Sequence, residues 1–314
     1  MPEEVDAVVI GSGINSLVAA AILAEAGWEV CVLERSSWLG GAIRTAEITR
    51  PGFRHDLFSA WHPLFVLGEA YERLGPALRE RGLSYRCVEE VTATLYPDGA
   101  AAFLTTSFDR NAAELDRHCP GDGGAWRDDL AAFEARAALS FGLLSAELSS
   151  LDGARLALRA TRELGVSGSL ELAGESLASA RSWLQATFSS PRAHGLFAPW
   201  VLHTGLGPDA ASSGFMGRAI ASVLQGAGLP VPEGGGEMLV LALARLLADR
   251  GGSAHADVPV DAVTVSHGRA TGVVLEGGDR VRARRAEDSG ESGHPVRSFR
   301  TPSWGLGPQR SRSG

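Results

Sequence analysis

The chain has 314 residues, which is long enough for a sizeable core and for two structural lobes. Its hydrophobic content of 45% and charged content of 21% are ordinary for a globular protein. Because the formal net charge is −8, we expect no general electrostatic attraction to nucleic acid or anionic lipid.

The spacing of metal-binding and apolar residues excludes several further classes. Cys31, Cys87 and Cys119 lie far apart in the sequence, so neither a disulfide framework nor a zinc site is expected. The eight histidines show no HxxxH or HExxH spacing, and no metal is predicted. No apolar run approaches the roughly 20 residues of a spanning helix, and the N-terminus is acidic, unlike a signal peptide. The cytoplasm is therefore the expected location.

The start of the chain follows the order strand, helix, strand. Residues 5–10 (VDAVVI) form a short β-branched run, which is typical of a strand buried on both faces. Residues 17–27 are rich in Ala and Leu and end at a glycine, as helices often do. Residues 29–34 (EVCVLE) form a second strand-like run. This order predicts a βαβ unit and a parallel sheet.

A glycine box, GSGINS, lies between the first strand and the helix. Gly11 lets the chain turn sharply, Gly13 lets the backbone approach a pyrophosphate at the helix N-terminus, and Ser16 keeps the third position small. Glu34 follows Gly11 by 23 residues and can accept hydrogen bonds from ribose hydroxyls. Its charge would repel a 2′-phosphate, which disfavours NADP. The box predicts a dinucleotide site, and an ordinary βαβ turn without a ligand is the alternative.

A second glycine-containing loop follows the carboxylate. Gly40 and Gly41 would let the backbone come close to a ligand, and Arg44 could reach phosphate or flavin oxygens. A nicotinamide dinucleotide needs no such second loop. FAD is longer, and its ribityl and isoalloxazine parts need protein contacts beyond the pyrophosphate. This spacing favours FAD over NAD.

Two histidines lie in the segment that continues from this loop. Residues 52–65 (GFRHDLFSAWHPLF) contain His55 and His62, the candidate catalytic residues. Packing, or a hydrogen bond to a backbone carbonyl, is the alternative role for each. Residues 67–82 then predict a helix in two pieces, broken at Pro76.

The rest of the chain predicts a hairpin, a helical region and a small meander. Residues 91–106 form two strand-like runs around the turn PDG, and residues 109–225 have mixed helical spacing. Within the helical region, Trp200 and His203 are candidates to line an apolar substrate cavity, with an ordinary helical core as the alternative. After a further helix, residues 256–284 predict antiparallel strands.

The end of the chain has a different composition. Residues 287–314 are dominated by Ser, Gly, Arg and Pro, without periodicity and almost without core-forming residues. This composition predicts disorder. We interpret the change as the result of a shifted reading frame or a truncated gene.

The N-terminal region resembles a known family. DAVVIGSGINSLVAAAILAEAGWEVCVLERSSWLGGAIRT is similar to the phytoene desaturase-like branch of FAD-dependent oxidoreductases. That branch lies within a group that includes amine oxidases and Rab GDP-dissociation inhibitors. The resemblance is specific over residues 5–65 and returns at VPEGGGEMLVLALARLLADRGG and in the meander.

The resemblance implies an α/β fold, with a doubly wound Rossmann-like FAD-binding domain and an inserted, mostly helical α+β substrate domain. The C-terminal part of the FAD-binding domain is expected to be missing. The expected divisions are residues 1–90 and 231–286 for the FAD-binding domain, 91–230 for the substrate domain and 287–314 for the aberrant tail. The residues implied to contact FAD are Gly11, Gly13, Ser16, Glu34, Arg35, Gly40, Gly41, Arg44 and Val260, the last through its backbone at the adenine.

The function implied is that of an FAD-dependent oxidoreductase of the dehydrogenase or desaturase type. Its partner would be a small apolar organic substrate, such as an isoprenoid, and not nucleic acid. Peripheral contact with a membrane is a further partner that the resemblance allows. The alternatives are a non-catalytic binding protein with the GDP-dissociation-inhibitor architecture, a dehydrogenase that uses NAD alone, and an inactive truncated product.

Overall fold

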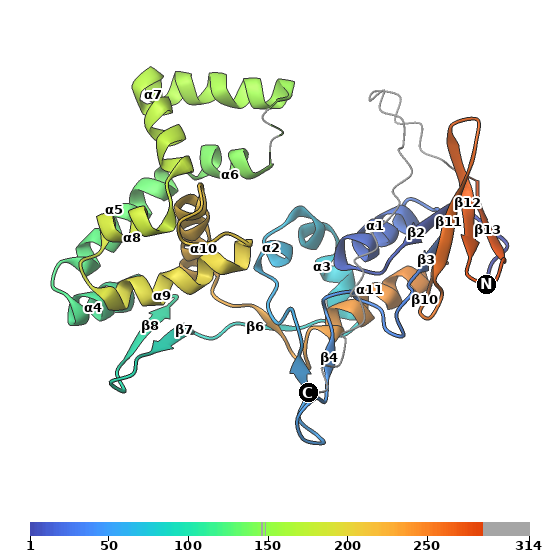
Figure 1. Cartoon of the computed structure of the whole chain (residues 1–314). Helices are drawn as coiled ribbons and strands as arrows, with labels where there is room; N and C mark the ends of the chain where they lie inside the picture. The colour runs from blue at the N-terminus through green and yellow to red at the C-terminus, as the bar shows by residue number, and fades with distance from the viewer. Residues whose placement is uncertain (146, 148, 285–314) are drawn as a thin grey trace, which may run out of the picture. The chain divides into compact units, whose positions relative to one another are not determined.

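A computed structural model describes residues 1–145, 147 and 149–284, which form two compact units (Figure 1). Unit 1 contains Met1–Ala60, Glu69–Ser84 and the described residues from Pro232 to Arg284, and unit 2 contains Trp61–Gly68 and Tyr85–Val231. The short segment Trp61–Gly68 belongs to unit 2, whereas the predicted boundaries placed it within the first part of the FAD-binding domain. The tail expected at residues 287–314 lies outside the described residues.

A three-stranded parallel sheet forms the centre of unit 1. Its strand order is β10 (Ser253–His255), β3 (Val30–Leu33) and β2 (Ala7–Ile10). Helix α1 (Ile14–Glu25) connects β2 to β3, and α11 (Glu237–Asp249) precedes β10. The two helices contact each other and the sheet, so they cover one of its faces. This arrangement confirms the predicted α/β, Rossmann-like fold.

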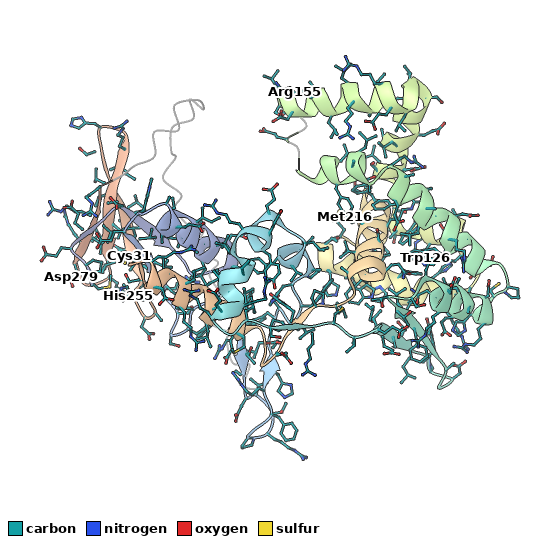
Figure 2. All side chains as sticks on the ribbon, turned by 180° about the vertical axis from the view of Figure 1, so that it is seen from behind. Cys31, Trp126, Arg155, Met216, His255 and Asp279 are labelled. Carbon is teal, nitrogen blue, oxygen red and sulfur yellow. The ribbon has the colours of Figure 1, made fainter. Side chains whose placement is uncertain are left out.

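An antiparallel meander covers the other face of the parallel sheet. It consists of β11 (Val260–Ser266), β12 (Arg269–Leu275) and β13 (Arg280–Ala283), with β1 (Glu4–Val5) added in parallel beside β13. Buried side chains fill the space between the two sheets, and Cys31 is one of them (Figure 2). They are Val5, Cys31, Leu33, Val273, Leu275 and Val281.

Two predictions about unit 1 are wrong. The strand expected at residues 5–10 is divided, because β1 pairs with the meander and β2 pairs with β3. The helix α3 (Glu69–Glu80) runs without a break through Pro76. Leu74 and Leu78 are fully buried on either side of that proline, so packing outweighs the hydrogen bond that it removes.

Two small pairs of strands complete the β-structure. β4 (Thr45–Ala46) pairs with β5 (His55–Asp56) in unit 1, as an antiparallel hairpin. β6 (Tyr85–Arg86) pairs with β9 (Val231–Pro232) where the chain passes from one unit to the other.

Unit 2 combines one hairpin with a set of helices. Strands β7 (Glu90–Leu95) and β8 (Ala101–Thr105) are antiparallel around the turn PDG, which confirms the predicted hairpin. The helices are α2 (Pro63–Val66), α4 (Phe108–His118), α5 (Asp122–Ala135), α6 (Ala137–Ser145), α7 (Leu151–Leu177), α8 (Ala180–Thr187), α9 (Pro191–Val201), the 3-10 helix η1 (Leu202–Thr204) and α10 (Ser213–Ala227). Helix α7 is kinked at Gly165, whose φ is 71°. None of the helices in the described ranges is both long and apolar enough to span a bilayer.

Aromatic side chains form the core of unit 2. The rings of Phe188 and Phe197 are stacked at 5.3 Å, and Trp126 lies 4.9 Å from Phe197 between ring centroids. Trp183 contacts the same phenylalanine and donates its indole N–H to Asp129 at 2.9 Å. Because these rings come from α5, α8, α9 and the short segment after α8, they join the helices into one core.

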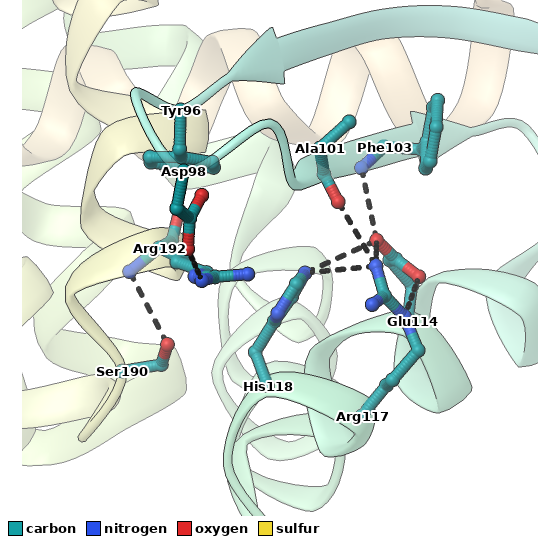
Figure 3. A network of polar contacts seen from close by, with 9 residues as sticks. All are labelled: Tyr96, Asp98, Ala101, Phe103, Glu114, Arg117, His118, Ser190 and Arg192. Atoms are coloured by element: carbon teal, nitrogen blue, oxygen red, sulfur yellow. Dashed lines mark hydrogen bonds and ion pairs between the residues drawn. The ribbon is translucent and has the colours of Figure 1, made fainter.

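A polar network ties α4 to the hairpin (Figure 3). Glu114 accepts a hydrogen bond from the backbone N–H of Phe103 at 3.3 Å, and Arg117 donates to the carbonyl of Ala101 at 2.9 Å. Glu114 also accepts hydrogen bonds from Arg117, and its carboxylate lies 3.2 Å from His118 Nε2. Burial raises the pKa of Glu114, but the bonds from Arg117 and His118 outweigh that effect and lower it overall. The exposed edge of β8 therefore has side-chain partners.

A second network is buried between α4, α5 and α10. The side-chain oxygen of Gln225 accepts hydrogen bonds from Asn111 at 2.5 Å and from Trp126 at 3.4 Å. Its amide nitrogen donates to the carbonyl of Thr106 at 2.9 Å. Asn111 in turn bonds both backbone groups of Thr105 at 2.7 Å. Every amide group in this network has a partner, so it fixes how α10 packs against the end of β8.

Replacing Gln225 with alanine tests the energetic weight of this network. We expect Gln225→Ala to lower the free energy of unfolding by about 2–4 kcal/mol, because it leaves the buried Asn111 and Trp126 donors without their acceptor. The control is Gln185→Ala on the exposed face of α8, for which we expect a change within about 0.5 kcal/mol. Urea unfolding followed by tryptophan fluorescence measures both. Equal stabilities for the two variants would contradict the prediction.

Candidate functional site

The glycine box forms the turn from β2 into α1, at the carboxyl end of the parallel sheet. The backbone N–H of Gly11 donates to the carbonyl of Leu33 at 2.8 Å, which holds the turn against β3. Gly11 has φ of +87°, a conformation that favours glycine. Gly13 is the N-cap residue of α1, and Ser16 lies in the first turn of the helix. Ligands of open α/β sheets bind at this edge.

The two helices that cover the sheet begin in different ways. At α11, Asp56 accepts the N–H of Gly236 at 2.8 Å and Thr45 accepts the N–H of Glu237 at 3.1 Å. At α1, the N-cap residue makes no side-chain hydrogen bond, and the first turn holds no acidic residue. Since uncapped amides and the helix dipole both favour an anion, the N-terminus of α1 is suited to a phosphate group and that of α11 is not.

Gly13 is a glycine that the fold itself does not require. Its φ is −57°, which other residues adopt readily. A Cβ placed on Gly13 would meet no protein atom within 4 Å. Neither backbone strain nor packing therefore explains the glycine, whereas the close approach of a bound group to this backbone would explain it.

Ser12, between the two glycines, connects the glycine box to Glu34. Its backbone N–H and its hydroxyl both donate to Glu34 Oε2, at 2.9 and 2.8 Å. Ser12 is completely buried. The backbone N–H of Ser36 donates to the other oxygen, Oε1, at 2.8 Å. These hydrogen bonds hold Glu34 in place before any ligand is considered.

The carboxylate of Glu34 remains charged and keeps acceptor capacity. Burial raises its pKa, but the hydrogen bonds from Ser36 and Ser12 outweigh burial and lower the pKa below its usual value. An ionised carboxylate can accept about four hydrogen bonds, two on each oxygen. Of the three hydrogen bonds given above, two are on Oε2 and one is on Oε1, so Oε1 is the oxygen better suited to a further donor such as a ribose hydroxyl.

The second loop lies directly against the first. The backbone N–H of Gly40 donates to the carbonyl and to the hydroxyl oxygen of Ser12, at 3.1 and 3.0 Å. A Cβ on Gly41 would stand 3.2 Å from the Cα of Gly13. A Cβ on Gly40 would stand 2.6 Å from both the Ile43 carbonyl oxygen and a methyl group of Val240. Contacts within the protein thus already require Gly40, in addition to any role in binding a ligand.

Two arginines predicted to contact the cofactor lie near these loops. The guanidinium of Arg44 stacks on the ring of Trp38, 3.8 Å from its centroid, and the Trp38 indole donates to the carbonyl of Gly41 at 3.5 Å. Arg35 is exposed directly after Glu34. Across the described residues, neither arginine forms an ion pair with a carboxylate. Their donors are therefore compatible with an anionic ligand.

Val260 starts the first strand of the meander, close to the end of β3. Its side chain packs against the cluster between the two sheets, which contains Leu33. Just before it, the backbone N–H of Val258 donates to the carbonyl of Glu34 at 2.8 Å. The structure thus brings Val260 into the same unit and to the same end of the sheet as the glycine box. The predicted contact of its backbone with adenine stays a prediction.

The two candidate catalytic histidines have different surroundings. His55 is exposed on β5, and its Nε2 lies 2.8 Å from the hydroxyl of Thr49. His62 is buried in unit 2, with its Nδ1 3.3 Å from the hydroxyl of Tyr85. His55 belongs to unit 1 and His62 to unit 2, and a catalytic role for either stays a prediction.

Three rings form a partly exposed aromatic cluster in unit 2. Trp61 meets Trp200 edge-on at 5.4 Å between centroids, and His203 stacks on Trp200 at 4.9 Å. Both tryptophans are half-buried against the core of unit 2, and His203 is exposed. Trp200 and His203 were predicted together, whereas Trp61 was not, because it is distant in the sequence.

Sequence reasoning also missed Ser12, Thr45 and Asp56. Ser12 occupies a variable position of the glycine box, and only its burial between the two loops reveals its role. A small hydroxyl residue between the two glycines of the box is the local signal that points to it. Thr45 and Asp56 lie about 190 and 180 residues before the amides that they cap, and no local pattern could reveal such pairs.

Comparisons with known proteins fit this geometry. Residues 9–74 match the model of an NAD(P)-binding Rossmann-like domain. A phytoene desaturase (neurosporene-forming) of Cereibacter sphaeroides is 26% identical over 92% of this chain and 53% of its own length. The chain is a relative of the phytoene desaturase-like oxidoreductases. This confirms the resemblance drawn from the glycine box and the second loop.

Two further proteins are similar to this chain, one in sequence and one in fold. The pyridine nucleotide-disulfide oxidoreductase domain-containing protein 2 of Rattus norvegicus is 32% identical over 90% of this chain and 52% of its own length. A cyclohexylamine oxidase from Brevibacterium oxydans has a similar fold, with a TM-score of 0.53 at 20% identity, over 89% of this chain and 56% of that one. The chain thus spans about half the length of the curated relatives that it matches.

Replacing Glu34 with glutamine tests the hydrogen bonds that hold the carboxylate. We expect Glu34→Gln to lower the free energy of unfolding by about 1–3 kcal/mol near neutral pH, because its amide group cannot accept from all three donors. Since the folded-state pKa is lowered, the contribution of Glu34 is present above its unfolded pKa of about 4.3 and disappears as the pH falls through the lower folded value.

The measurement is urea unfolding from about pH 7 to about pH 3. The difference between wild type and Glu34→Gln should stay constant down to about pH 5 and then shrink. The control is Glu276→Gln, at an exposed position of unit 1. A difference that grows on acidification would contradict the prediction.

Proposed function

We propose that the protein is an FAD-dependent oxidoreductase of the dehydrogenase or desaturase type, which acts on a small apolar organic substrate. The relatives span about twice the length of this chain, so the proposal concerns the activity of a whole protein of this kind. The observation that carries it is the uncapped N-terminus of α1 together with Gly13, a glycine that neither the backbone nor the packing requires.

The residues present fit the adenosine diphosphate part of FAD. The amides at the start of α1 would receive the diphosphate, and Oε1 of Glu34 would accept a ribose hydroxyl. The charge of Glu34 disfavours a 2′-phosphate at the same place. NAD and FAD share the part of the molecule that these features suit, so the features support an adenine dinucleotide without distinguishing the two.

The second loop favours FAD within that class. Gly41 lies against Gly13, so the second loop adjoins the start of α1, where the diphosphate would bind, and the longer FAD molecule has a further part that can contact it. The guanidinium of Arg44, stacked on Trp38, supplies a fixed positive charge in that loop. NAD alone leaves this second loop without a role in binding.

When it is bound, FAD supplies the acceptor for a hydride or for electrons. The contribution of this chain is to hold and orient the ligand through α1, Ser12 and Glu34. Because Ser12 joins both loops to the carboxylate, the binding surface is organised before the ligand arrives, which lowers the entropic cost of binding.

The aromatic cluster of Trp61, Trp200 and His203 supports an apolar, unsaturated substrate. Half-exposed rings in edge and stacked contacts offer a flat, apolar surface, and isoprenoids with conjugated double bonds are the example that we propose. No charged side chain belongs to the cluster. Contact with a membrane surface, where such substrates dissolve, remains part of this proposal, and the cytoplasm is the proposed location.

The Gly13→Ala variant tests the cofactor site. We expect wild-type protein incubated with FAD to retain it after gel filtration, with visible flavin absorbance. Gly13→Ala should weaken FAD binding at least about tenfold, because a methyl group stands where the diphosphate approaches. The free energy of unfolding should change by less than about 1 kcal/mol, since the poorer N-cap and the stiffer unfolded chain oppose each other.

The control is Gly124→Ala, in the first turn of α5, where a Cβ also meets no protein atom within 4 Å. It should bind FAD as the wild type does. Wild-type protein that binds NAD but no flavin would favour the NAD-only alternative. Protein that folds but binds neither would favour the non-catalytic binding protein, and protein that does not fold would favour the inactive product.

The Trp200→Ala variant tests the proposed substrate surface. All-trans-retinol serves as the probe, because it is a fluorescent isoprenoid with conjugated double bonds. We expect Trp200→Ala to weaken retinol binding by about tenfold, through the loss of one large aromatic contact. The control is Phe103→Ala, an exposed aromatic residue on β8 of the same unit. Equal retinol affinity for wild type and Trp200→Ala would overturn the assignment of this cluster.

A further inference from the structure

His255 stands at the carboxyl end of the parallel sheet, beside Glu34. It is the last residue of β10, in register with Leu33 at the end of β3, and it is labelled in Figure 2. The backbone N–H of Glu34 donates to the carbonyl of His255 at 2.9 Å. The imidazole is therefore attached to the backbone that also positions the carboxylate.

One nitrogen of this imidazole has no partner in the protein. Within the part of the chain that the structure describes, Nε2 of His255 is buried and makes no hydrogen bond. Buried polar atoms almost always have a hydrogen-bond partner, and an exception indicates strain, an ordered water or a ligand. The fold alone gives no reason for a polar atom here, because an apolar residue would fill the same place without an unsatisfied nitrogen.

The register also indicates which surface the imidazole faces. Residues in register on neighbouring parallel strands project to the same face, and Leu33 belongs to the cluster between the sheets. Val258 and Val260 pack against that cluster. His255 thus lies on the side of the sheet that faces the start of the meander.

The segment that follows His255 is held in an unusual conformation. Asp257 has φ of +56°, which is uncommon for a residue other than glycine. Its N–H donates to the carbonyl of Ser36 at 2.9 Å, and the N–H of Val258 donates to the carbonyl of Glu34 at 2.8 Å. These bonds hold the segment across the turn at residues 34–36. Strained backbone that is fixed in this way is frequent at ligand sites.

We propose that His255 is a further ligand-binding residue, whose Nε2 hydrogen-bonds the adenosine half of the bound dinucleotide. This inference rests on the proposed function. The adenosine half is the part expected here, because Glu34 is the proposed ribose contact and Val260 the proposed adenine contact. Adenosine carries both donors and acceptors, so either tautomer of the imidazole can pair with it.

The test uses the full chain and two probes, ADP and FAD, measured by calorimetric titration. His255→Phe keeps the shape of the ring but removes both nitrogens, and we expect it to weaken ADP and FAD binding by about fivefold to tenfold. The thermal unfolding midpoint of the ligand-free protein should stay equal or rise, since an unsatisfied polar atom is removed. His267→Phe, at an exposed turn of the same unit, is the control and should leave both affinities unchanged.

A pair of amide variants keeps the test decisive if the phenylalanine variant does not fold. The amide of glutamine reaches the position of Nε2, whereas that of asparagine reaches only the position of Nδ1. We expect His255→Gln to bind ADP within about twofold of wild type, and His255→Asn to lose about as much affinity as the phenylalanine variant.

The outcomes separate this inference from the proposed function. If the wild type binds FAD and ADP while His255→Phe and His255→Asn bind them equally well, the role of His255 is overturned and the proposed function stands. If the wild type binds neither probe, the proposed function itself fails, and the role of His255 fails with it.

Discussion

The hydrogen bonds of one buried serine hold the site together. Ser12 donates twice to Glu34 and accepts from Gly40, so the glycine box, the carboxylate and the second loop are positioned by a single residue. Because Ser12 is completely buried, these bonds do not compete with water, and losing one partner would leave the others unsatisfied. The same bonds lower the pKa of Glu34 and keep its charge available for a ligand.

This network divides the glycines of the site into two kinds. Gly40 is required by its neighbours, because a side chain would collide with the Ile43 carbonyl and with Val240. Gly13 meets no such obstacle and is free of backbone strain. The glycines of one motif can therefore have different roles, some in packing and some in ligand binding. Only the glycine that the fold leaves unexplained points to a ligand, and it stands at the helix N-terminus that lacks a cap.

The parts predicted well from the sequence were those set by local patterns. The βαβ unit, the hairpin around the turn PDG and the strands of the meander follow from short apolar runs and turn residues. The parts that were missed depend on contacts between distant residues. Ser12 acts through Gly40, Thr45 and Asp56 cap α11, and the packing around Pro76 keeps α3 continuous. The residues that contact the cofactor and the substrate stay predictions.

A crystal structure of the protein with FAD bound would show whether the start of α1 and Glu34 hold the cofactor. We expect the diphosphate to lie against the backbone of Gly11 to Gly13 at the start of α1, with a ribose hydroxyl on Oε1 of Glu34. Diphosphate density at the N-terminus of α11, or FAD bound with Glu34 still contacting only Ser12 and Ser36, would contradict it.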